Sequence, residues 1–92
     1  MRKAELVAAV AATTGLGRTQ AGHVLNIVLD EIMFALERGE TVSLPGFGSF
    51  SRRHRAGRTG RNPQTGEEMQ IAAGYAVVFR PGKQLKDAVV QD

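Results

Sequence analysis

The chain has 92 residues, a formal net charge of +3 and no cysteine, which excludes disulfide bonds. This length supports one small domain, residues 1–92, that buries too little surface to be very stable alone. We therefore expect oligomerisation to add stability, and the lack of any long apolar window predicts a soluble, cytoplasmic protein with no membrane partner.

The first predicted element is a helix over residues 3–14. Leu6 and Val10 recur at helical spacing, alanine fills most of the remaining positions, and Glu5 suits the positive end of a helix. Gly15 follows directly and is expected to end the helix.

A second, longer helix is predicted from about Arg18 to Arg38, with Gly17 as its N-cap and Gly39 as the residue that closes it. Its apolar residues cover more of the circumference than one partner surface can bury. One helix and one small sheet per chain can hardly cover them, so a second subunit is implied. The main apolar stripe consists of Ala21, Val24, Leu25, Val28, Leu29, Ile32, Ala35 and Leu36.

Three strands and a short helix are expected in the second half of the chain. Alternation of polar and apolar residues marks the strands, and Pro-Gly pairs mark the turns. In chain order the elements are a strand at 41–44, a turn at 45–46, a strand opened by Phe47 and Phe50, a return strand from Met69 to Phe79, and a helix from Lys83 to Val90.

The most distinctive segment is 52–65, which holds five arginines and no acidic residue. It has no large apolar side chain before the turn, so neither face of this ribbon belongs in a core. The sequence Asn62-Pro63-Gln64-Thr65-Gly66 has residues typical of a turn, which places Pro63 at an exposed tip. Arginine suits phosphate oxygens. A basic, extended arm with an apolar tip therefore predicts a duplex nucleic acid as the ligand.

Charge is unevenly divided along the chain. Residues 1–50 carry four Lys and Arg against five Asp and Glu, whereas residues 51–92 carry eight against four. A merely solvated face usually mixes the two signs. The excess of positive charge in the second half therefore favours a binding surface.

With these residues the chain resembles the HU and integration host factor family of bacterial DNA-bending proteins, and HU most closely. The densest match consists of Gly46-Phe47-Gly48-Ser49-Phe50, Gly60-Arg61-Asn62-Pro63-Gln64-Thr65-Gly66 and Phe79-Arg80-Pro81-Gly82-Lys83. The resemblance spans essentially the whole chain.

The fold implied by the resemblance is α+β. It is an intertwined homodimer with a helical body, made of two N-terminal helices and a short C-terminal helix, and a three-stranded antiparallel sheet extended into a β-ribbon arm. Residues 1–51 and 75–92 would form the dimerising body, and residues 52–74 the arm. The implied dimer core consists of Leu25, Leu29, Ile32, Leu36, Leu44, Phe47, Phe50 and Phe79.

The implied function is that of a histone-like protein of the bacterial nucleoid. Its arms would enter the minor groove of duplex DNA, and Pro63 would intercalate between base pairs and bend the duplex, as apolar wedges do in this family. Nicked, gapped or flexible DNA should bind best. The implied DNA-binding residues are Lys3, Arg53, Arg55, Arg58, Arg61, Asn62, Pro63, Gln64, Arg80, Lys83 and Lys86.

Two residues depart from the family pattern. Many members carry a basic residue and a proline along residues 74–77, where this chain has Tyr75 and Val77. The return strand is therefore expected to pair more continuously, and one phosphate contact at the base of the arm to be missing.

The sequence offers little for catalysis or metal binding. No nucleophile with a neighbouring base and no phosphate-binding Gly-rich loop is recognisable, so we expect no enzyme and no cofactor. His23 and His54 lie too far apart in a chain without cysteine to form a convincing metal site. We expect His23 at the surface of its helix and His54 to face phosphate among the arginines.

Three alternatives stay open beside the nucleoid hypothesis. The first is a site-specific, heterodimeric factor of the integration host factor kind, paired with a paralogue. The second is an RNA-binding protein that uses the same arms, with RNA as a weaker ligand. The third is a scaffold whose arms clasp an acidic protein. The arm has no aromatic residue on which unpaired bases could stack, which counts against the RNA reading.

Overall fold

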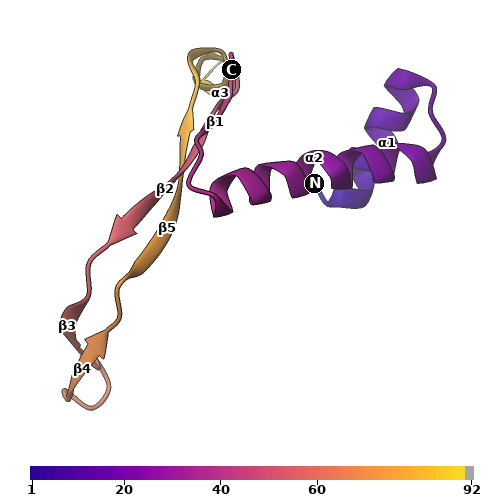
Figure 1. Ribbon diagram of the computed structural model, residues 1–92. Coiled ribbons are helices and arrows are strands. Elements are labelled where there is room, and N and C mark those ends of the chain that lie inside the picture. Colours follow the sequence, from indigo (N-terminus) through magenta and orange to yellow (C-terminus); the bar gives the residue numbers. More distant parts are fainter. Residues whose placement is uncertain (91–92) are drawn as a thin grey trace.

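In the computed structural model, which describes residues 1–90, the first two helices form a hairpin (Figure 1). α1 spans Lys3–Thr14 and α2 spans Arg18–Glu37. Gly15, with φ of 77°, ends α1 and donates its N–H to the carbonyl of Ala11 at 3.0 Å. Within the described residues, Ala11 and Ala21 alone are buried. Small side chains at this contact let the two helices approach closely.

α2 ends one residue earlier than expected, at Glu37 instead of Arg38. Gly39 adopts φ of 84°, and the N–H groups of Gly39 and Glu40 bond to carbonyls of the last helical turn at 3.0 and 2.9 Å. These two bonds are those of a Schellman motif. The guanidinium of Arg38 lies 3.1 Å from the Glu40 carboxylate, and this hydrogen bond lowers the pKa of Glu40.

The three-stranded antiparallel sheet has the order β1–β2–β5. β1 spans Val42–Leu44, β2 spans Gly48–Arg55 and β5 spans Gly74–Pro81. Phe50 pairs with Phe79 in the β2–β5 ladder, whereas β1 covers only the first three residues of β2. The expected sheet is confirmed. Its first two strands each begin one residue later than the sequence suggested.

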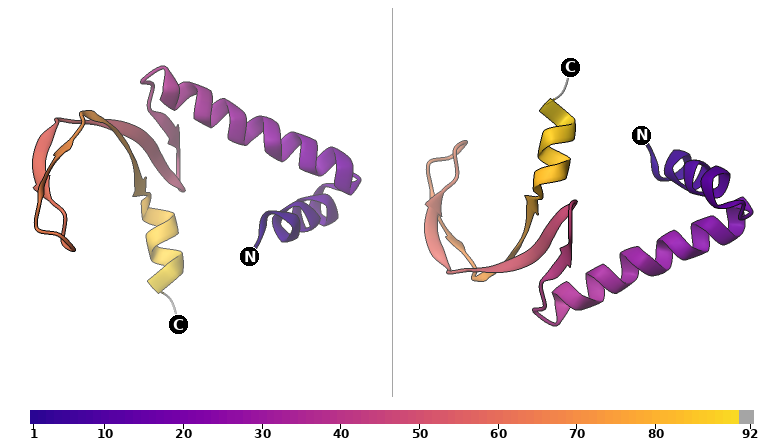
Figure 2. Two further views of the ribbon diagram at one scale, coloured as in Figure 1. Left: turned by 90° about the horizontal axis from the view of Figure 1, so that it is seen from below. Right: turned by 90° about the horizontal axis from the view of Figure 1, so that it is seen from above.

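The outer part of the arm is a separate two-stranded ladder, which corrects the expectation of unbroken strands. β3 spans Arg58–Arg61 and β4 spans Glu68–Ile71. Residues 56–57 and 72–73 lie between the two ladders and belong to neither. They are alanines and a glycine, which have low strand propensity. Both views in Figure 2 show the resulting ribbon as a curved arm.

α3, Lys83–Val90, follows β5 directly and has the expected bounds. Gly82 donates its N–H to the carbonyl of Phe47 at 2.8 Å, and Leu85 donates to the carbonyl of Gly46 at 3.2 Å. The start of α3 is therefore tied to the turn between β1 and β2. No helix of residues 1–90 is long and apolar enough to span a bilayer.

The single chain is extended and leaves much apolar surface uncovered. Its Cα radius of gyration is 18.7 Å, against about 12 Å for a compact domain of this length. Its accessible surface is 7549 Å², against roughly 5200 Å² for a compact protein of this mass. Helices and ribbon meet along a short border (Figure 1).

The residues assigned to a dimer core lie on this open surface. The Phe79 ring packs 4.7 Å from that of Phe50 and 5.6 Å from that of Phe47, centroid to centroid. Even so, Leu29, Leu44, Phe47 and Phe79 keep 42, 38, 48 and 38 % of their surface exposed. Leu25, Ile32, Leu36 and Phe50 are half-buried.

Gly48 should be the least replaceable glycine of the sheet. A Cβ there would lie 2.6 Å from the carbonyl oxygen of Arg80 and 2.7 Å from ring carbons of Phe79. We expect Gly48→Ala to lower the free energy of unfolding by about 2 kcal/mol or more. At Gly74 a Cβ meets nothing within 4 Å, so Gly74→Ala should change stability by less than about 0.5 kcal/mol. Urea unfolding at one fixed protein concentration measures both, and equal losses would contradict the steric argument.

Candidate nucleic-acid interface

The β2–β5 ribbon has two chemically different faces, because side chains alternate along a strand and paired residues share a face. On one face lie Ser49, Ser51, Arg53 and Arg55, opposite Arg80, Val78, Ala76 and Gly74. On the other lie Phe50, Arg52 and His54, opposite Phe79, Val77 and Tyr75. The register thus separates one basic face from one that is largely aromatic and apolar.

The basic face gathers three of the expected DNA-binding residues. Arg53 and Arg55 are two residues apart on β2, and Arg80 lies further along the same face on β5. All three are exposed. Their β-strand partners are small or of moderate size, so the guanidinium groups project without a covering side chain. This arrangement can donate several hydrogen bonds along a row of phosphates.

The opposite face holds Arg52 and His54, which the sequence had grouped with the other cations. The Arg52 guanidinium carbon lies 4.1 Å from the centroid of the Tyr75 ring. It also donates a hydrogen bond to the backbone oxygen of Glu37 at 3.1 Å. His54 meets the same ring edge-on, at 5.5 Å between centroids. His54 therefore shares the face of Tyr75, apart from the face that carries Arg53 and Arg55.

A signal for this separation was available in the sequence. Phe50 is an apolar residue near the start of the strand, and period-two alternation places Arg52 and His54 on its face. The run of five arginines in ten residues obscured this alternation, because it suggested a single basic surface.

In the outer ladder, Arg58 and Arg61 are three residues apart and therefore lie on opposite faces of β3. Arg61 pairs in register with Glu68, and Thr59 accepts a hydrogen bond from the Gln70 amide at 3.5 Å. The arm thus presents positive charge on both of its sides.

The tip of the arm is a closed turn that exposes Pro63. Gly66, at φ of 73°, donates its N–H to the carbonyl of Asn62 at 2.7 Å, and Gln64 donates to the Asn62 side-chain oxygen at 2.9 Å. Pro63 has no N–H to satisfy, and its ring is exposed. The Asn62 side chain is used to shape the turn, and the Gln64 side chain is exposed.

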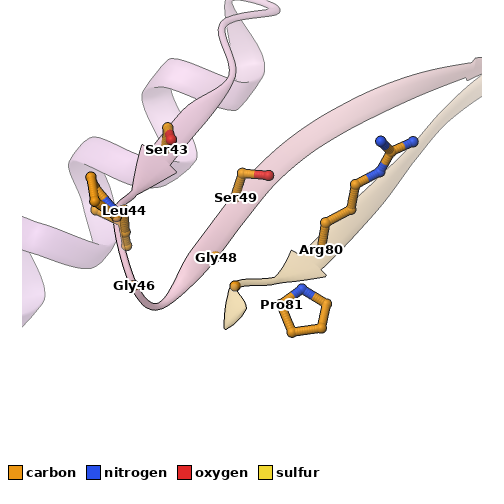
Figure 3. Close-up of a pocket in the computed structure, with 9 residues that line it drawn as sticks. Ser43, Leu44, Gly46, Gly48, Ser49, Arg80 and Pro81 are labelled. Atoms are coloured by element: carbon orange, nitrogen blue, oxygen red, sulfur yellow. The ribbon is translucent and has the colours of Figure 1, made fainter. Parts of the chain in front are cut away.

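A shallow hollow lies where the sheet meets the β1–β2 turn (Figure 3). It has a volume of about 270 Å³ and is lined by Ser43, Leu44, Gly46, Ser49, Arg80 and Pro81 among others. Ser49 and Arg80 are register partners on β2 and β5. Two hydroxyl groups and one guanidinium are therefore available as donors at the base of the arm.

The remaining expected contacts lie on helices. Lys3 begins α1, while Lys83 and Lys86 lie in the first turn of α3. The Lys83 ammonium is 2.7 Å from the Asp87 carboxylate, a pair that remains largely exposed. α1, which begins at Lys3, is separate from the arm in the single chain (Figure 1).

Nothing in residues 1–90 gathers three or more His, Cys, Asp or Glu side chains into a metal site. His23 is exposed on α2, as expected from the sequence.

Tyr75 and Val77, which depart from the family pattern, lie on the aromatic face of the ribbon. Pairing of β5 with β2 is continuous through both residues.

Comparison with known sequences agrees with this geometry. A family model described as bacterial DNA-binding protein matches residues 1–90. DNA-binding protein HU-alpha of Pseudomonas aeruginosa is 55 % identical over 89 residues, covering 97 % of this chain and 99 % of the relative. DNA-binding protein HU of Geobacillus stearothermophilus is 54 % identical with the same coverage.

Solved structures give the same assignment. An Anabaena HU–DNA cocrystal structure superposes with a TM-score of 0.92 at 42 % identity and covers 100 % of both chains. The V42I mutant of Thermotoga maritima HU gives 0.72 at 30 % identity, covering 97 % of this chain and 99 % of the other. By sequence and by fold, the chain belongs to the bacterial DNA-binding protein family of which the HU proteins are members.

Proposed function

We propose that this protein is a histone-like, nucleoid-associated protein that binds duplex DNA with little sequence preference and bends it. The observation that carries the proposal is the exposed row of Arg53, Arg55 and Arg80 on one face of a ribbon that ends in an exposed proline. The relatives are named as DNA-binding proteins, and one neighbour was crystallised with DNA.

The proposed contacts follow the minor groove. Arginines of the arm bind phosphates on either side of the groove, because Arg58 and Arg61 project from opposite faces of β3. The minor groove offers a degenerate hydrogen-bonding code, so recognition depends on shape and deformability more than on base identity. Arg80, Lys83 and Lys86 extend the contacts along the base of the arm. Lys3 contacts the flank of a long bound segment.

Pro63 is the proposed intercalating residue. It lies exposed at the tip, and the turn that holds it is closed by hydrogen bonds from Gly66 and Gln64. Unstacking one base step costs a few kcal/mol, and a rigid ring on a closed turn loses little entropy when it enters the step. A nick, a gap or a flexible step lowers that cost, so such DNA is the preferred ligand.

The binding unit is proposed to be a homodimer. Uncovered side chains on α2 and on the sheet would form its core, and the excess surface of the single chain, about 2300 Å² over a compact protein of its mass, is of the size that obligate interfaces bury. Residues 1–51 and 75–92 are assigned to the dimerising body and residues 52–74 to the arm. The dimer would place two basic arms on one duplex.

The proposed place of action is the bacterial nucleoid in the cytoplasm. We assign the protein no enzymatic activity and no cofactor, in keeping with relatives named for DNA binding. A heterodimer with a paralogue and a weaker affinity for RNA are the alternative partners that the binding experiments below must separate.

DNA affinity should fall steeply with salt. The slope of log K against log salt is about −0.9 for each phosphate neutralised on duplex DNA. Arg55→Gln should therefore make this negative slope shallower by about 0.9 for each phosphate contact removed. Arg38→Gln, which removes a cation paired with Glu40 on the helical hairpin, should leave it unchanged.

Gel shifts over a salt series measure this slope on nicked, intact and random-sequence duplexes and on structured RNA. Nicked DNA should bind most tightly and RNA least. Preferential binding of one sequence over random DNA would favour the integration host factor alternative, and tighter binding of RNA would contradict the proposal.

Pro63→Ala should abolish most of the DNA bend while leaving the salt slope nearly unchanged, because it removes the wedge and no charge. Fluorescence energy transfer between the ends of a short duplex reports the bend. Pro45→Ala is the matched control, since Pro45 occupies the exposed β1–β2 turn outside the arm. If Pro63→Ala bends the duplex as strongly as the parent, the intercalation assignment is wrong.

Leu29→Asp should disrupt the dimer. It places a carboxylate on the main apolar stripe of α2, where the single chain leaves Leu29 exposed. His23→Asp makes a comparable change on the same helix, away from this stripe, and should not alter assembly. Light scattering of both variants measures their mass. A Leu29→Asp protein that remains a dimer would refute the assigned core.

A further inference from the structure

Arg52 is held differently from the other arginines of the arm. Its guanidinium stacks over the Tyr75 ring at 4.1 Å and donates to the Glu37 backbone oxygen at 3.1 Å. Arg52 is half-buried, whereas Arg53 and Arg55 are exposed. The contacts of Arg52 thus lie within the protein, on the face of the ribbon opposite to the basic row.

The acceptor of Arg52 is at the end of a helix. Glu37 is the last residue of α2, so its carbonyl lacks an intrahelical partner and lies at the negative end of the helix dipole. A cation is favoured at this position. Gly39 makes room for it, because a Cβ there would lie 3.0 Å from a terminal nitrogen of Arg52. The helix end and the arginine are therefore matched in charge and in shape.

Tyr75 extends the contact to the second strand of the ribbon. It pairs in register with His54, whose ring meets it edge-on at 5.5 Å between centroids. Arg52 on β2, Tyr75 on β5 and Glu37 on α2 thus connect three elements at one point. Figure 1 shows that the ribbon approaches α2 only near the C-terminal end of that helix.

We propose that Arg52 is a positioning residue and makes no phosphate contact. Together with Tyr75 and the Glu37 carbonyl it forms a clamp that fixes the angle at which the arm leaves the helical hairpin. That angle sets the path of a bound duplex between the arms, so this inference rests on the proposed DNA-bending function. Tyr75, at the base of the arm, then acts through Arg52.

The first test needs no DNA. Protons of Arg52 stacked on the Tyr75 ring should show upfield ring-current shifts in the NMR spectrum of the free dimer. Tyr75→Phe keeps the ring and should keep the shifts, whereas Tyr75→Leu should abolish them. Unshifted Arg52 resonances in the parent protein would overturn the clamp, whatever the variants do.

The second test measures binding and bending together. Arg52→Met keeps an unbranched apolar stem but removes the guanidinium, and Arg53→Met makes the same change on the basic face. Arg53→Met should reduce the salt slope by about 0.9 for each phosphate contact removed. Arg52→Met should leave the salt slope unchanged. It should lower the efficiency of energy transfer between the ends of a short bound duplex, or broaden the distribution of that efficiency.

Tyr75→Leu is the decisive companion, because it removes no charge and should reproduce the bending defect of Arg52→Met. Circular dichroism and light scattering establish that each variant is folded and dimeric. A reduced salt slope in Arg52→Met, or a parental bend in Tyr75→Leu, would overturn the proposal. A parent protein that fails to bend DNA would refute the proposed function, while the ring-current measurement would still decide whether the clamp exists.

Discussion

The fixed register between β2 and β5 is the constraint on which the rest of the structure depends. Pairing Phe50 with Phe79 buries part of an aromatic cluster, and alternation then assigns every other side chain of the ribbon to a face. Arg53, Arg55 and Arg80 are exposed together as a consequence. A slip of β2 by one residue would exchange its two faces. Phe50 would then lie on the face that now carries Arg53 and Arg55, and these two guanidinium groups would lie on the face of the Phe79 ring.

Much of the fold was predictable because its signals are local. The helical spacing of Leu6 and Val10, the glycines that end both long helices, and the Asn-Pro turn at the arm tip each specify one conformation. The interruption at residues 56–57 and 72–73 was not predictable from either strand alone. It arises because small residues of two distant segments come opposite each other, and only the register reveals that coincidence.

The site was predictable in composition and less so in arrangement. Pro63 lies at an exposed tip as expected, and Arg53, Arg55 and Arg80 share one face. The position of Arg52 and His54 on the other face was missed, because charge was counted along the chain without regard to alternation. Their contacts with Tyr75 and Glu37 join elements far apart in sequence. No local pattern encodes such a contact, whose geometry depends on where α2 ends.

The gap between the two ladders of the arm has a mechanical consequence. Each ladder is stiffened by its own cross-strand bonds, whereas the two segments that join them carry no such bonds within the described pairing. Torsion therefore concentrates at this joint. In the proposed complex with DNA, the outer hairpin would turn at this joint while the inner ribbon stays against α2, so that one protein would fit grooves of unequal curvature without stretching any strand.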